Sequence, residues 1–92
     1  MRVVWTSIAL ERAQEIRELI ALDRPQAATR WLDELEQIVS SLDRFPRRGR
    51  VVPEFSDPHI REIQHQPYRI IYEIRGDVVA ILTIRHGRQR IK

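Results

Sequence analysis

Two apolar runs near the end of the chain, residues 68–75 and 78–84, are separated only by Gly76 and Asp77. A two-residue loop that begins with glycine reaches positive φ at little cost and fits the twist of two antiparallel strands, so a tight β-hairpin is predicted. Counting outward from the loop pairs Ile74 with Val79, Tyr72 with Ile81, Ile70 with Thr83 and Tyr68 with Arg85, and on the other face Glu73 with Ala80, Ile71 with Leu82 and Arg69 with Ile84. In this register both faces of the hairpin are largely apolar.

An apolar second face distinguishes this hairpin from the strands of a simple two-layer domain, in which buried and exposed residues alternate. A layer of helices can cover only one face. The other face is expected to be covered by residues 43–58, by the C-terminal tail or by another chain. A partner chain is the preferred covering, because exposed apolar patches on small proteins usually mark binding sites.

Two amphipathic helices are expected between residues 7 and 42. Thr6 or Ser7 can cap the first, because a hydroxyl accepts a hydrogen bond from a first-turn N–H. Asp23 is predicted to cap the second, with Gln26 at the capping-box spacing and Pro25 in the first turn. The apolar stripe of the second helix consists of Ala28, Trp31, Leu32, Leu35, Ile38, Val39 and Leu42. The short break between the helices predicts an antiparallel helical hairpin whose apolar side packs on a sheet.

Strands are predicted on both sides of the helices. Residues 2–5 are β-branched and aromatic, and residues 60–65 are expected to form the strand that supports the hairpin. Residues 43–58 contain four proline or glycine breakers and are expected to form a loop. The chain is therefore predicted to be a single α+β domain over residues 1–92, ordered β-α-α-β-β-β, with an N-terminal helical hairpin packed on a mainly antiparallel twisted sheet.

Basic residues concentrate in two segments of a chain whose net charge is only +3. Residues 44–50 carry four arginines and no acid, and residues 85–92 carry three arginines, one lysine and no acid. Such segments favour an anionic or acidic partner, although solvated loops and tails give the same pattern. The absence of cysteine excludes disulfides and thiolate metal sites. No apolar run approaches the roughly 20 residues of a membrane span, so a cytoplasmic location without membrane association is expected.

Motifs that carry chemistry are few. His59, His65 and His86 lack the spacings of a zinc site, and the three glycines form no phosphate-binding loop, so neither a metal nor a cofactor is expected. The remaining candidates for binding a target lie on the last strands and are Arg61, Arg69, Arg85, His86 and Arg88. In the register given above, Arg69 and His86 point to the same side of the sheet. Such a cluster could bind phosphates, with His86 moving a proton in RNA cleavage, could grip a carboxylate surface, or could be a solvated strand end.

Three features of the sequence together span the whole chain. They are the element order, the motif Tyr-Arg-Ile-Ile-Tyr at residues 68–72 and the ending Leu-Thr-Ile-Arg-His-Gly-Arg at residues 82–88. In these features the chain resembles the RelE/ParE superfamily of toxins from type II toxin–antitoxin modules, and the His-Gly-Arg ending is typical of the ParE-like branch. Arg69 matches an arginine of the RelE-like branch, and Arg88 lies near the position of a further basic residue. The lysine pair of that branch is replaced by Arg61 and Glu62, and its C-terminal tyrosine is missing.

The resemblance implies a toxin that inhibits DNA gyrase, and so replication and growth, without acting as an enzyme. The five candidates above would then contact the target. The alternative is a RelE-like ribosome-dependent mRNA endonuclease, with His86, Arg69 and Arg88 as its catalytic residues. Either branch implies a cognate antitoxin as partner, contact with operator DNA only through that antitoxin, and a role in plasmid stabilisation. The sequence does not indicate which residues bind the antitoxin.

Overall fold

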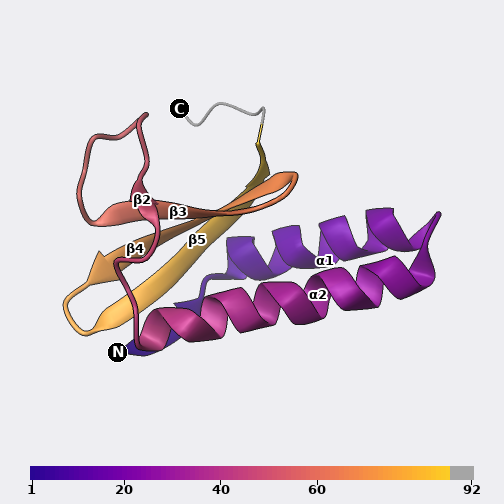
Figure 1. Cartoon of the computed structure of the whole chain (residues 1–92), viewed down its shortest axis with the longest axis horizontal. Coiled ribbons are helices and arrows are strands. Elements are labelled where there is room, and N and C mark those ends of the chain that lie inside the picture. Colours follow the sequence, from indigo (N-terminus) through magenta and orange to yellow (C-terminus); the bar gives the residue numbers. More distant parts are fainter. Residues whose placement is uncertain (88–92) are drawn as a thin grey trace.

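The chain folds into a helical hairpin packed on one face of a five-stranded sheet, in a computed structural model that describes residues 1–87. Its elements are β1 (Arg2–Trp5), α1 (Ser7–Ala21), α2 (Pro25–Ser40), the short 3-10 helix η1 (Ser41–Asp43), β2 (Arg50–Val51), β3 (Ile60–His65), β4 (Tyr68–Arg75) and β5 (Val78–His86). The strand order is β1-β5-β4-β3-β2, with β1 parallel to β5 and the other neighbours antiparallel. Both helices lie on the same side of the sheet, and their hairpin extends beyond it (Figure 1). The predicted α+β class is confirmed, with one strand more than expected.

Thr6 joins the start of α1 to the sheet. Its hydroxyl accepts a hydrogen bond from the Ala9 N–H at 3.1 Å, which is the helix cap expected from the sequence. The same hydroxyl donates to the Ile81 carbonyl of β5 at 2.7 Å. One side chain therefore both begins the helix and fixes its first turn against the strand that closes the hairpin.

The predicted cap of α2 is wrong. Arg24, not Asp23, occupies the N-cap position, and no side chain caps this helix. The reason is Pro25, which sits in the first turn as expected and restricts the residue before it to non-helical geometry. Arg24 accordingly has φ −138° and ψ 83°, and Asp23 lies one residue too early to cap.

A short strand interrupts the segment predicted to be a loop. Arg50 and Val51 pair with Glu62 and Arg61 of β3, which adds β2 to the edge of the sheet. Two residues are too few to show an alternating pattern, so the sequence gives no signal for this strand. The preceding Gly49 packs tightly, because a Cβ there would lie 2.6 Å from the Glu62 carbonyl oxygen.

The hairpin forms as predicted around Gly76, which has φ +58°, but its register changes along the strands. The pairs nearest the turn, Ile74 with Val79, Glu73 with Ala80 and Tyr72 with Ile81, are confirmed. Between Ile71 and Tyr72 a β-bulge shifts the pairing by one residue. The predicted outer pairs are therefore wrong, and the observed ones are Ile71 with Thr83, Ile70 with Ile84, Arg69 with Arg85 and Tyr68 with His86.

The main core lies between the helices and the sheet. Its fully buried members include Leu35 and Leu42 from the helical side and Tyr72 and Ile81 from the sheet. Truncating such a leucine to alanine typically costs about 2–5 kcal/mol. The second face also contains buried apolar residues, since Ile71 is 1% exposed without belonging to the helix-facing core. The segment after β2 lies on that face (Figure 1), so the chain itself covers part of the surface for which a partner chain was preferred.

Within residues 1–87, neither helix combines the length and the apolar character needed to cross a membrane.

Candidate functional site

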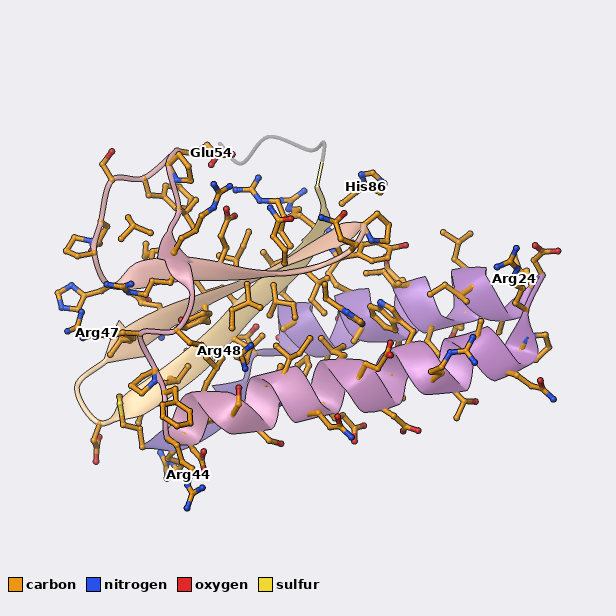
Figure 2. The ribbon with its side chains drawn as sticks, in the orientation of Figure 1. Arg24, Arg44, Arg47, Arg48, Glu54 and His86 are labelled. Carbon is orange, nitrogen blue, oxygen red and sulfur yellow. The ribbon has the colours of Figure 1, made fainter. Side chains whose placement is uncertain are left out.

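The arginine at the centre of the predicted site is buried and bonded to two carboxylates. Arg69 lies on β4, on the face away from the helices, and is 6% exposed. Its Nη1 and Nη2 donate to the two carboxylate oxygens of Glu54 at 3.1 and 3.0 Å, in a forked arrangement. Its Nε donates to Glu62, whose side chain is fully buried on β3. Figure 2 shows Glu54 on the segment that lies over this face of the sheet.

A second arginine joins this ion network. Arg50 of β2 donates from Nε to the other oxygen of Glu62. The hydrogen bonds from Arg69 to Glu54 raise the pKa of Arg69 above its ordinary value, against the effect of burial, and Glu62 adds to the rise. Removing one partner of such a pair is costly, because the other charge stays buried. The network of Arg50, Glu54, Glu62 and Arg69 therefore ties the segment after β2 to the sheet.

Arg61 is also used within the chain. It pairs in register with Tyr72, which places it on the opposite side of β3 from Glu62. Its Nε donates to the Pro58 carbonyl at 3.0 Å, and its Nη1 donates to the Gly49 carbonyl at 2.9 Å. These bonds hold the residue before β2 and the last part of the segment between β2 and β3, so this arginine stabilises the chain on both sides of β2.

The end of β5 separates the two residues that were expected to act together. Arg85 pairs with Arg69 and lies on the same face, half-buried. His86 pairs with Tyr68 on the opposite face, with the two ring centroids 5.8 Å apart. Tyr68 in turn packs edge-on against Trp31 of α2 at 5.6 Å. The prediction that Arg69 and His86 share one side of the sheet is wrong, because the β-bulge leaves Leu82 unpaired and so moves the β5 residues beyond it to the other face.

The predicted cluster thus does not form one surface among residues 1–87. Arg69 and Arg85 come together, Arg61 and His86 lie on the other side, and Arg88 is outside the described residues. Sequence reasoning noted Glu62 only as an acid at the position of an expected lysine, and it gave Glu54 no role. An acid on a strand predicted to support the hairpin that carries Arg69 could have indicated internal pairing for Glu62. For Glu54 no such signal exists, because its contact depends on how the loop folds.

No group of three or more histidine, cysteine or acidic side chains is placed to hold a metal ion in the part of the chain that the structure describes. The arrangement offers an ion network on one face and an aromatic cluster with His86 on the other. Its clearest chemical property is that the guanidinium of Arg69 is already bonded to carboxylates.

Comparisons with known proteins define the class. Residues 3–91 match the family described as the ParE toxin of type II toxin–antitoxin system, parDE. The fold is that of a toxin from such a module. The chain belongs to the ParE toxin family, and its partner is an antitoxin.

Individual relatives carry names from both branches of the superfamily. Toxin RelE2 of Caulobacter vibrioides is 36% identical over 87 residues, which cover 94% of each chain. Toxin ParE3 of the same organism is 30% identical over 66 residues, or 72% of this chain and 65% of that protein. A solved structure described as the chromosomal ParDE TA system from P. aeruginosa matches with a TM-score of 0.79 at 20% identity, over 94% of this chain and 95% of the other. At that identity the structural match shows the fold alone.

Proposed function

We propose that this toxin inhibits DNA gyrase, blocks replication and so arrests growth, and that it acts by binding rather than by catalysis. The family supports a toxin of the ParE type. The observation that favours binding over RNA cleavage is the state of Arg69, whose guanidinium is bonded to Glu54 and Glu62. A buried arginine that is satisfied in this way is poorly placed to stabilise the charge that develops on a cleaved phosphate.

The position of His86 supports the same choice. A proton donor or acceptor in RNA cleavage must reach the phosphate that the basic residues hold. His86 is on the helical side of the sheet, beside Tyr68, while Arg69 and Arg85 are on the other side. Arg85 and His86, at the end of β5, remain proposed target contacts. Arg61 of β3 and Arg69 of β4 instead hold the loop between β2 and β3 in position.

Gyrase inhibition is tested with purified toxin in a supercoiling reaction. The expected result is loss of supercoiling as toxin is added, with recovery when the cognate antitoxin is supplied in excess. Normal supercoiling at a large excess of folded toxin would contradict the proposal. Operator DNA is expected to be bound by the toxin–antitoxin complex through the antitoxin, so toxin alone should not shift an operator fragment.

The alternative is a ribosome-dependent mRNA endonuclease, and the similarity to a relative named RelE2 favours it. Under that alternative, His86→Ala abolishes toxicity together with mRNA cuts. Under the gyrase proposal, His86→Ala leaves most of the inhibition, because single contacts in an interface are mostly weak. His59→Ala, at an exposed loop position, is the matched control. Primer extension on a translated message, read alongside growth, separates the two results.

A further inference from the structure

The segment that follows α2 presents an exposed aromatic ring among arginines. Phe45 is 61% exposed, although phenylalanine is one of the residues most often buried. Arg44, Arg47 and Arg48 around it are exposed as well. With Pro46, three of these residues line an open hollow of about 430 Å³. The Phe45 surface is defined here as Arg44, Phe45, Arg47 and Arg48.

Hydrogen bonds hold this segment in one conformation. The Phe45 N–H donates to the Ser41 carbonyl at 3.0 Å, and the Arg48 N–H donates to the Phe45 carbonyl at 3.1 Å. The buried hydroxyl of Tyr72 donates to the Pro46 carbonyl at 2.7 Å and accepts from the Gly49 N–H at 3.0 Å. These bonds hold the backbone around Phe45 in place while its side chain stays exposed, which lowers the conformational entropy lost when the segment binds a partner.

Among the described residues, no carboxylate forms a salt bridge with the arginines of the Phe45 surface. The Arg48 Nη1 donates instead to the uncharged Ser41 hydroxyl at 2.6 Å. Figure 2 shows Arg44, Arg47 and Arg48 at the end of the molecule opposite Arg24, which lies at the tip of the helical hairpin. This end is a concentrated positive charge around an apolar side chain.

We propose that the Phe45 surface docks on an acidic patch of the protein that the toxin inhibits, with Phe45 entering an apolar pocket and the arginines meeting carboxylates at its rim. This inference rests on the proposed function for the identity of the target. Aromatic residues and arginine dominate the binding energy of protein interfaces. Guanidinium groups also match carboxylates in forked geometry. The charge of the surface is therefore complementary to an acidic protein.

The shape of the surface favours the target over the antitoxin. An exposed ring on a hydrogen-bonded backbone can enter a concavity on a folded protein, whereas a partner that binds through a helix or an extended segment needs a groove. A groove of that kind lies elsewhere, between α1 and α2, where Leu10, Leu32 and Val39 are among the lining residues and the volume is about 540 Å³. The two partners are therefore expected to use different parts of the molecule.

The test compares full-length toxins that carry single substitutions. Phe45→Ala and Arg47→Glu change the Phe45 surface, and neither removes a buried group. Phe55→Ala, at a 40% exposed ring on another loop, and Arg24→Glu, at the far end, are the matched controls. For each variant the toxin concentration that halves gyrase supercoiling is measured, together with affinity for the cognate antitoxin and growth arrest on induced expression.

The expected result is a rise of about tenfold or more in the half-inhibitory concentration for Phe45→Ala and for Arg47→Glu, with the controls and the antitoxin affinity unchanged. Retention of full potency by both variants overturns the inference. Loss of antitoxin binding with normal potency also overturns it, because the surface would then serve the antitoxin. Binding to plain duplex DNA that Arg47→Glu removes and Phe45→Ala leaves intact would point to phosphate contact instead, and would equally overturn it.

Failure of the proposed function can be recognised separately. If the unmodified toxin leaves gyrase active, the gyrase proposal fails on that measurement alone. The docking surface is then tested by growth arrest on induced expression of each variant, because the inference still requires that Phe45→Ala and Arg47→Glu weaken toxicity while the two controls do not. Full toxicity of both surface variants would contradict it.

Discussion

Arg69 and Arg47 bear the same guanidinium group in opposite surroundings. Arg69 is buried in the sheet and donates hydrogen bonds to two carboxylates, whereas Arg47 is exposed and lacks a salt bridge among the described residues. The first belongs to an ion network that holds a loop in place, and the second to an exposed surface for which docking on a partner is proposed. Positive charge in this toxin is therefore placed in two ways, and an exposed arginine without an internal carboxylate partner is better suited to recognition than one bonded as Arg69 is.

The largest loss of folding stability is expected from a substitution at the centre of the ion network. Glu62→Ala leaves the buried Arg69 without one of its partners, and we expect the free energy of unfolding to fall by about 3–5 kcal/mol. Denaturant unfolding measures the change. Glu73→Gln, on the neighbouring strand where the carboxylate pairs with exposed Arg75, should cost no more than about 1 kcal/mol. If the two substitutions cost the same, the network does not have the stabilising role given to it here.

A smaller loss is expected where the core supports the Phe45 surface. Tyr72→Phe removes the hydroxyl between the Pro46 carbonyl and the Gly49 N–H, and an unsatisfied buried group typically costs about 1–3 kcal/mol. Tyr68→Phe is the matched control, at a partly buried ring on the same strand. We further expect Tyr72→Phe to weaken gyrase inhibition, since Phe45 would be held less firmly. Unchanged stability and potency together would show that the hydroxyl does not position this segment.

The same tyrosine predicts a dependence on alkaline pH. Burial raises the pKa of Tyr72 above its ordinary value of 10.0. The unfolded chain therefore loses this proton at lower pH than the folded chain, so the stabilising contribution is complete below pH 10 and is lost as pH rises through the folded pKa. Unfolding measured at a series of pH values from neutral to alkaline should show this decline for the natural chain. A decline of equal size in Tyr72→Phe would assign it to other groups.

The smallest effect is expected at the exposed edge of the network. Glu54→Gln keeps hydrogen-bond acceptance by one oxygen and removes a charge that is only partly buried, so we expect a loss of about 1 kcal/mol or less. The variant also removes a negative charge that is bonded to the guanidinium of Arg69, so it tests the nuclease alternative directly. We expect no mRNA cleavage from Glu54→Gln. Appearance of specific cuts would indicate that the carboxylate masks a phosphate site.

Residues with a strong local pattern were predicted well. The stripe of α2, the cap at Thr6 and the turn at Gly76 each follow from a few neighbouring residues, and all are present. The predicted outer register of the hairpin is wrong because one bulge reverses the facing of the β5 residues beyond it, and no residue type in the sequence indicates a bulge at this position. The same error placed His86 beside Arg69.

The candidate site was less predictable than the fold because it depends on long-range contacts. The sequence offers Arg69 as a candidate for target binding, but it does not show its bond to Glu54, which requires the loop after β2 to fold back over the sheet. The sequence shows the positive charge of residues 44–50 as one segment. The structure divides that segment, since Arg50 forms a salt bridge with buried Glu62, whereas Arg44 and Arg47 form no salt bridge among the described residues.

Gyrase inhibition without RNA cleavage is tested most directly by applying one preparation of the toxin to two reactions in parallel. One is gyrase supercoiling of a plasmid, and the other is translation of a defined message on purified ribosomes followed by primer extension. The expected result is inhibited supercoiling with an intact message, and reversal by the antitoxin. Cuts in the message with normal supercoiling would contradict the proposed function and restore the nuclease alternative.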